Sequence, residues 1–202
     1  PCALFNDRTS PECNLDIPIW KLLRASTAAP VYFPPETITL GKQTHSFIDG
    51  GITPYNNPSL IAFLTATLPE YKIDWKPGEK NLLLVSVGTG LNRARFAPRG
   101  LIPSVLAQLA HLPPAMIHGA MQQQDVMCRI LGKCVAGDAL DMELGELRND
   151  LRLMGEPMFR YARFNRQSKD SVKMDAVHRM QELLDSGRAF AKETVRVGDL
   201  FE

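Results

Sequence analysis

The sequence has 202 residues, of which 45% are hydrophobic and 22% charged, and its formal net charge is +1. These values are typical of an ordinary globular protein with one well-packed core, and the near-neutral charge provides no basic footprint for nucleic acid. The longest apolar runs, Leu60–Leu68 and Leu82–Val87, fall well short of the roughly 20 residues that a transmembrane helix needs. Composition therefore predicts one globular domain without a nucleic-acid partner.

The cysteines and histidines lack the spacing of a metal site. No CxxC pair is present, and no two histidines stand at i and i+4 beside a carboxylate. We therefore predict no metal and no disulfide framework. The residues concerned are Cys2, Cys13, Cys128, Cys134, His45, His111, His118 and His178.

The first half of the chain reads as alternating strands and helices. Ala3–Asn6 is typical of a short strand, and Asp16-Ile17-Pro18 opens a helix that ends at Pro30. A loop follows, and then Thr44–Ile48 is predicted as a strand. Asn57-Pro58 starts the next helix, which Pro69 ends, and the apolar run Asn81–Val87 indicates a buried strand. From residue 44 to residue 87 this order predicts a right-handed crossover between parallel strands.

Beyond Gly90 the pattern is mostly helical. A short apolar stripe begins at Val105 and is cut by Pro113-Pro114, and a longer one runs from Ile117 to a predicted C-cap at Gly132. Met158–Phe164 alternates aromatic and basic residues, which favours a late strand, and a terminal helix is predicted over residues 177–187. We find no repeats and no linker, so a single domain is expected.

Asp49 is the carboxylate in the most promising position. It stands where the predicted strand Thr44–Ile48 gives way to a turn, and Gly50 and Gly51 follow it. Open α/β sheets place their chemistry at the carboxyl ends of strands, and glycines without a Cβ allow a ligand to approach closely. Most Asp-Gly-Gly tripeptides, however, are simple tight turns. The motif alone therefore supports either a structural turn or a catalytic acid or base.

Two further stretches have a structural and a functional interpretation. Ser86–Gly90 resembles the start of a dinucleotide loop, but Arg93 occupies the third glycine position, so a strand-ending turn is favoured. Leu101–Met121 is apolar with few charges, which indicates core packing or a surface for acyl chains or a membrane. No G-x-S-x-G is present, so no serine has the elbow that exposes a nucleophile.

Three segments in this order resemble the second half of the patatin-like phospholipase family. They are Ala25–Pro35 (ASTAAPVYFPP), then Ile48–Gly51 (IDGG) with Asn56-Asn57-Pro58, then Ser86–Gly90 (SVGTG). Phe159–Asn165 and Met174-Asp175 are also similar to bacterial members. The resemblance implies a three-layer α/β/α fold whose mostly parallel sheet is flanked by helices, with residues 1–202 forming the C-terminal portion of a single domain.

What the resemblance implies for function is lipid acyl hydrolysis by a Ser-Asp dyad. Asp49 matches the dyad Asp, and Gly50 and Gly51 match the active-site turn. The family's serine and its oxyanion-binding glycine loop lie upstream of such an Asp, so we expect the upstream half of the domain as a partner and little activity from this chain alone. Expected further partners are a lipid or acyl-ester substrate and a peripheral membrane contact. No cofactor is implied, and we expect a cytoplasmic protein.

A second hypothesis comes from another class of protein. The chain could be a non-catalytic lipid-binding or interaction module that keeps the patatin fold without the nucleophile. A third, a dinucleotide enzyme built on the Gly88–Gly90 turn, is disfavoured by the missing glycine. A serine elbow upstream of Pro1 would favour the hydrolase over the module.

Overall fold

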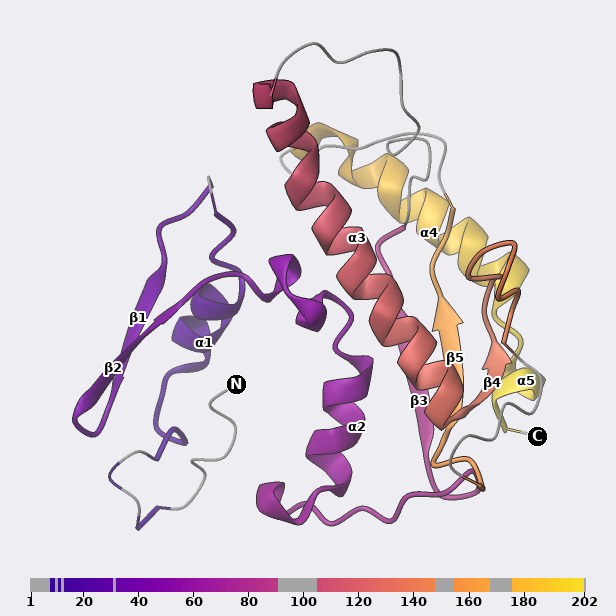
Figure 1. The fold of residues 1–202 in the computed structure, drawn as a ribbon, viewed down its shortest axis with the longest axis horizontal. Helices are drawn as coiled ribbons and strands as arrows, with labels where there is room; N and C mark the ends of the chain where they lie inside the picture. Colours follow the sequence, from indigo (N-terminus) through magenta and orange to yellow (C-terminus); the bar gives the residue numbers. More distant parts are fainter. Residues whose placement is uncertain are drawn as a thin grey trace. The chain divides into compact units, whose positions relative to one another are not determined.

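The chain folds into two compact units in a computed structural model that describes residues 8–9, 11, 13–30, 32–90, 105–147, 155–167 and 176–201 (Figure 1). The first unit comprises Pro1–Trp75 with Met116–Gln124, and the second comprises Lys76–Ala115 with Asp125–Glu202. Among the described residues, no helix combines the length and the apolar character needed to cross a membrane.

The first unit begins with a helix that packs on a β-hairpin. Helix α1 (Ile19–Ser26) places Ala25 against Ile38 and Leu40, and these three buried side chains form a small core. The hairpin consists of the antiparallel strands β1 (Glu36–Leu40) and β2 (Gln43–Phe47). Gly41 takes a φ of +57° in the two-residue connection, a conformation that glycine adopts without steric cost.

After the hairpin, the described elements of the first unit are helices and 3₁₀ turns. Two single-turn 3₁₀ helices, η1 (Gly50–Ile52) and η2 (Pro54–Asn56), come after β2. Helix α2 (Ser59–Thr67) and the 3₁₀ turn η3 (Pro69–Tyr71) come next. Pro69 opens η3, as expected for a proline that ends the preceding helix.

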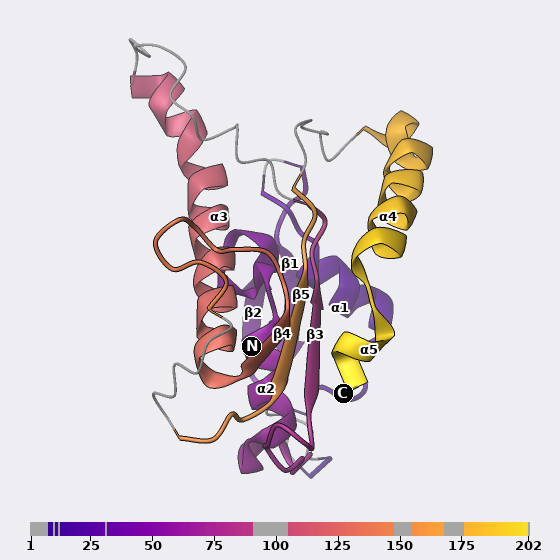
Figure 2. The same cartoon turned by 90° about the vertical axis from the view of Figure 1, so that its right-hand side faces the viewer.

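The second unit is a parallel sheet between helices. The strands β3 (Leu83–Val87), β5 (Arg160–Phe164) and β4 (Lys133–Ala136) lie in the order β3-β5-β4, and both pairs are parallel. Figure 2 shows this sheet edge-on, with α3 on one side and α4 and α5 on the other. These helices span Val105–Leu131, Met180–Thr194 and Val197–Phe201, and the 3₁₀ turn η5 (Val177–Arg179) precedes α4.

The core of the second unit lies under α4 and α5. Ala136, Ala162 and Phe164 are buried on one face of the sheet, where Phe190 and Leu200 pack against them. Helices on both faces of a parallel sheet make an α/β architecture, which confirms the fold class predicted from the sequence.

The predicted crossover between residues 44 and 87 is wrong. β2 pairs with β1, which the sequence indicated as a loop, and the pair is antiparallel. β3 belongs to a different sheet, where its neighbour is β5. The physical reason is local: two residues connect β1 to β2, so the hairpin closes a far shorter loop than pairing with β3 would require.

Three predicted helix ends are also wrong. α1 ends at Ser26 rather than at Pro30, because the N–H and the hydroxyl of Thr27 both donate to the Leu23 carbonyl and cap the helix there. α3 continues through Pro113-Pro114 over a span of 27 residues, although each proline removes one N–H donor from the helix. α4 continues through Gly187, which does not adopt the positive φ of a C-capping glycine. The predicted end of α3 at Gly132 is confirmed.

The remaining predictions on strands are mixed. The late strand predicted over Met158–Phe164 exists as β5 and lies at the centre of its sheet. β4 was not predicted. Ala3–Asn6 lies outside the described residues, and the single patatin-like domain over residues 1–202 stays a prediction.

Gly132 must be a glycine because Phe159 packs closely against its Cα, and its backbone conformation does not itself require glycine. A Cβ on this residue would lie 2.5 Å from Cε2 of Phe159 and 2.9 Å from the Phe159 carbonyl oxygen. Because Phe159 is fully buried, its ring has little room to move away. We expect Gly132→Ala to destabilise the protein by about 1–3 kcal/mol, measured as a lower urea midpoint.

The matched control is Gly119→Ala, also in the α3 region. A Cβ on Gly119 would meet no atom within 4 Å, and this residue is in the helix interior. Its replacement should be neutral or stabilising by up to about 1 kcal/mol. Equal effects at the two glycines would show that the contact with Phe159 is unimportant.

Candidate active site around Asp49

The backbone of Asp49 joins two of the segments that the sequence singled out. Asp49 follows β2 by two residues, and its N–H donates to the Ala28 carbonyl at 3.0 Å. Ala28 is completely buried in the loop after α1. The Ala25–Pro35 segment therefore fixes where the Asp-Gly-Gly turn begins.

The carboxylate of Asp49 is oriented by its own turn. Its Oδ1 accepts a hydrogen bond from the Gly51 N–H at 2.7 Å, and the side chain is half-buried. A Cβ on Gly51 would lie 3.0 Å from Oδ1, so a larger residue there would crowd the carboxylate. Oδ2 has no hydrogen-bond partner among the residues that the structure describes. One carboxylate oxygen is thus held in place while the other is available to accept a proton.

Thr53 closes the turn. Its hydroxyl donates to the Gly50 carbonyl at 2.7 Å and accepts from the Tyr55 N–H at 3.2 Å. A Cβ on Gly50 would stand only 3.6 Å from Cβ of Tyr55, so the tyrosine lies against this glycine. Neither residue was predicted from the sequence to belong to the site, although Thr before Pro54 is a recognisable helix-start signal. The turn around Asp49 is therefore braced by its own following residues.

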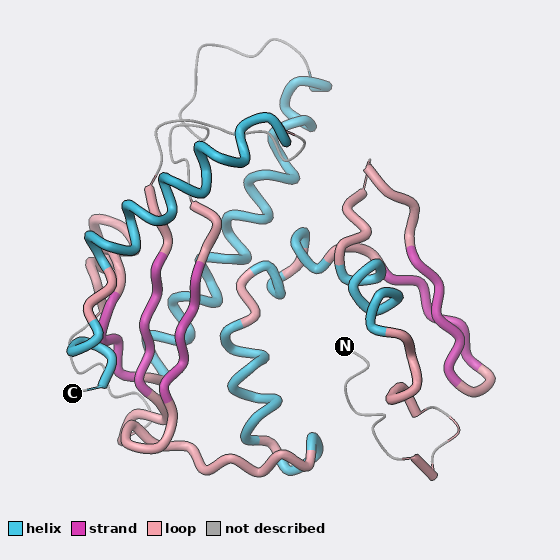
Figure 3. Tube along the Cα trace, turned by 180° about the vertical axis from the view of Figure 1, so that it is seen from behind, coloured by secondary structure: helices cyan, strands magenta, loops and turns pink. Residues whose placement is uncertain are grey.

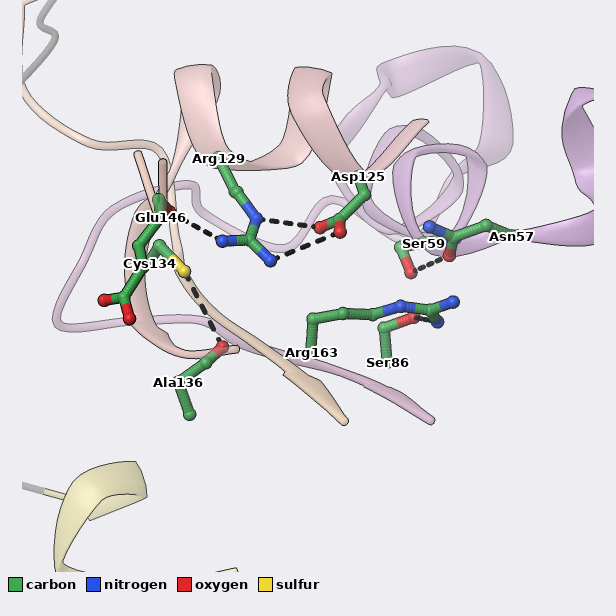
Figure 4. A network of polar contacts seen from close by, with 9 residues as sticks. All are labelled: Asn57, Ser59, Ser86, Asp125, Arg129, Cys134, Ala136, Glu146 and Arg163. Carbon is green, nitrogen blue, oxygen red and sulfur yellow. Dashed lines mark hydrogen bonds and ion pairs between the residues drawn. The ribbon is translucent and has the colours of Figure 1, made fainter. Parts of the chain in front are cut away.

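The start of α2 is fixed by a buried polar pair. Oδ1 of Asn57 accepts from the Ser59 hydroxyl at 2.6 Å and from the Ser59 N–H at 3.4 Å (Figure 4). The cap residue itself is Pro58, but Asn57 supplies the capping oxygen that the sequence predicted. This pair anchors the far end of the segment that contains Asp49.

The Ser86–Gly90 turn lies in the second unit, whereas Asp49 lies in the first. The Gly88 N–H donates to the Phe164 carbonyl at 2.8 Å, and the Gly90 N–H donates to Oδ1 of Asn165 at 3.1 Å. A Cβ on Gly88 would lie 2.2 Å from the same Asn165 oxygen. The close packing of Asn165 thus explains Gly88, whereas Gly90 adopts a φ of +103°, which favours glycine.

A buried arginine on β5, Arg163, forms a hydrogen bond to the neighbouring strand β3. Nη1 of Arg163 donates to the Ser86 hydroxyl at 2.6 Å, and both side chains are buried (Figure 4). The bond joins β5 to β3, whose residues 163 and 86 are paired in the register. Ser86 is therefore a structural serine at the end of β3, as its place in the strand predicted.

Cys128 on α3 is buried and chemically protected. Burial and, to a lesser extent, the negative charge of Asp125 raise the pKa of its thiol to about 12, although the positive charge of Arg163 opposes this rise. We expect iodoacetamide at pH 8 to leave Cys128 unmodified in the folded protein and to label it in urea, as measured by peptide mass spectrometry. The half-buried Cys13 serves as the internal comparison.

The raised pKa of Cys128 also has a consequence for stability. In the unfolded state the thiol loses its proton near pH 8.5, whereas in the folded state it keeps its proton up to about pH 12. The free energy of unfolding therefore falls as pH rises from about 8.5 towards 12. Cys128→Ser should remove part of this alkaline loss. Labelling of native Cys128 as fast as Cys13 would contradict the assignment.

Metal ligands do not gather in the described part of the chain. No group of three or more His, Cys, Asp and Glu side chains there is placed to hold a metal ion.

The sequence matches a known family over the region that contains this site. Residues 4–63 match the family model described as patatin-like phospholipase. Similar curated proteins include Patatin-15 and Patatin-B1 of Solanum tuberosum, each 34% identical over 93 residues, and Patatin-2-Kuras 4, 32% identical over 89 residues. The matches cover 41%, 41% and 39% of this chain.

The extent of these matches defines what they support. They cover 24% of the length of each relative. The family match includes Asp49, Gly50 and Gly51 and ends before Ser86. The resemblance predicted from the sequence is confirmed over this region.

Proposed function

We infer that this chain, which shares the patatin-like phospholipase sequence over residues 4–63, is part of a lipid acyl hydrolase in which Asp49 is the catalytic base. The observation that carries the proposal is the geometry of the Asp49 carboxylate. Oδ1 is held by the Gly51 N–H at 2.7 Å, and Oδ2 has no partner among the described residues. A general base must be positioned and yet have an oxygen within reach of the proton that it takes.

The proposed chemistry is acyl transfer through a serine. Asp49 Oδ2 accepts the proton of the serine hydroxyl as the oxygen attacks the ester carbonyl, and the alcohol leaves with a proton returned from Asp49. Backbone N–H groups stabilise the oxyanion, and water then hydrolyses the acyl-enzyme by the same base. Asp49 thus acts twice, once in each half-reaction.

The serine and the oxyanion donors are proposed to come from another part of the domain. These 202 residues contain no G-x-S-x-G, and Ser59 and Ser86 are engaged in structural hydrogen bonds. The nucleophile therefore needs a further segment that presents its hydroxyl to Asp49. The absence of the elbow from these residues is also what favours the second candidate, a non-catalytic lipid-binding module.

A fluorophosphonate probe tests the proposal. Such probes react with activated serines, so the protein expressed from the complete coding sequence should be labelled at one serine and should release fatty acid from a p-nitrophenyl ester. Residues 1–202 alone should give neither signal. A complete protein that folds but is neither labelled nor active would instead support the lipid-binding module.

A further inference from the structure

The parallel sheet of the second unit has two edges, and only one of them is protected. β4 forms the protected edge. It is four residues long, begins with Lys133 in an ion pair with Glu79, and has an irregular register between Cys134 and Ala136. Short length, a charged side chain and an irregular register all hinder the addition of a further strand. The sheet therefore ends at β4.

The opposite edge, β3, lacks these features. Its five residues (LLVSV) contain no charged side chain, and they pair with β5 in an unbroken parallel register. Figure 3 shows the three strands side by side, with β3 and β4 as the outer two. A regular, apolar and uncharged edge is a template for pairing, which natural sheets cover with another segment.

The direction of the backbone groups identifies the residues of β3 that face this open edge. The Gly88 N–H donates to the Phe164 carbonyl at 2.8 Å, so residue 88 faces β5. Because the direction alternates along a strand, the even-numbered residues of β3 face β5 as well. The odd-numbered residues point their N–H and C=O groups away from β5, and no strand among the described residues pairs with them. They are Leu83, Val85 and Val87.

The side chains of β3 indicate the same gap. Val85 is 45% exposed and Val87 76%, and both lie on the face of the sheet that carries their register partners Ala162 and Phe164. These two partners are buried beneath the helices of that face. Strands of a parallel sheet are normally covered on both faces. The helical layer over β5 therefore does not extend over β3 in the described part of the chain.

A strand beside β3 would pair the open backbone groups and cover the two valines. We propose that a further segment of the domain adds such a strand, parallel to β3. The direction follows from the sheet, in which both existing pairs are parallel. The curated relatives have chain to supply it, because the matches cover only 24% of each.

The added strand gives the proposed serine a place. A nucleophile elbow directly follows the carboxyl end of its strand, and the carboxyl end of a strand parallel to β3 lies beside the Gly88–Gly90 turn. Chemistry at this end of the strands is usual in open α/β sheets. That the segment carries the serine rests on the proposed function, whereas the pairing with β3 rests on the sheet alone.

Amide hydrogen exchange of the complete protein tests the pairing residue by residue. Mass spectrometry with electron-transfer fragmentation resolves neighbouring amides. At an open edge the protection alternates, because Leu84 and Ser86 donate to β5 while Val85 and Val87 donate only to water. We expect all four amides to exchange slowly in the complete protein, with Val85 and Val87 protected about 100-fold or more relative to an open edge. Residues 1–202 alone should show the alternating pattern.

A proline provides an independent test of the same hydrogen bond. Proline is tolerated on an edge strand where the lost N–H faced solvent, but not within a sheet. Val85→Pro should therefore lower the yield of soluble complete protein about tenfold or more relative to Val85→Ala, which removes the side chain and keeps the N–H. Equal yields of the two variants would contradict the proposal.

The other outcomes are distinguishable. Alternating protection in the complete protein would overturn the added strand, and fluorophosphonate labelling of that protein would still support the proposed function. Full protection without labelling would support the strand and contradict the proposed function. Protection of Val85 and Val87 in residues 1–202 alone would also overturn the proposal. The partner would then be a second copy if protection rises with protein concentration, and a segment of these 202 residues if it does not.

Discussion

Replacing Asp49 with Asn in the complete protein is expected to lower kcat for ester hydrolysis by about 10²–10⁴-fold while leaving the fold intact. The amide keeps an oxygen that can accept the Gly51 N–H, which donates to Oδ1 at 2.7 Å. It cannot take a proton from the serine, so the turn survives and the base is lost. Steady-state kinetics with a p-nitrophenyl ester, together with the urea midpoint, measure both quantities.

A second aspartate provides the matched control. Asp74 is exposed and has a φ of +54°, a conformation that Asn tolerates as well as Asp. Asp74→Asn should therefore keep full activity. Unchanged turnover by a folded Asp49→Asn protein would remove Asp49 from the mechanism, and equal losses in both variants would point to a nonspecific effect.

The candidate site was predictable where its chemistry is local in sequence. Asp49 precedes two glycines at the end of an apolar run, and the bond from Gly51 is made within three residues. The bond from Asp49 to Ala28 spans 21 residues, and the bond from Arg163 to Ser86 spans 77. Contacts between residues so far apart in sequence form only in the folded chain, so no local sequence pattern predicted them.

The strands show the same limit. β3 and β5 were predicted because each is a continuous or alternating apolar run. β4 has four residues, begins with Lys133 and follows α3 after one residue, so it carries little periodicity. β1 follows Pro34-Pro35, which indicated a loop. Which strand β2 pairs with depends on the length of the connecting loop, and β2 pairs with β1, its nearest strand in the sequence.

The largest effect on stability is expected from Arg129→Ala. The guanidinium is buried, and it donates through Nε to Oδ1 of Asp125 at 3.0 Å, through Nη2 to Oδ2 at 3.2 Å and through Nη1 to the Glu146 carbonyl at 2.6 Å. Burial alone would lower the pKa of Arg129, but the hydrogen bond and charge of Asp125 raise it above the ordinary value. Removing the arginine leaves a carboxylate that is largely buried and unpaired. We expect a loss of about 3–5 kcal/mol.

The control and the double variant separate the charge from the packing. Arg188 and Asp185 on α4 are both exposed and lie 3.6 Å apart, so Arg188→Ala should cost less than about 1 kcal/mol. Arg129→Met with Asp125→Leu removes both charges, and it should recover part of the loss because no carboxylate is left unpaired. A double variant no more stable than Arg129→Ala would place the cost elsewhere, in the lost bond to the Glu146 carbonyl, which holds the segment after β4 onto α3.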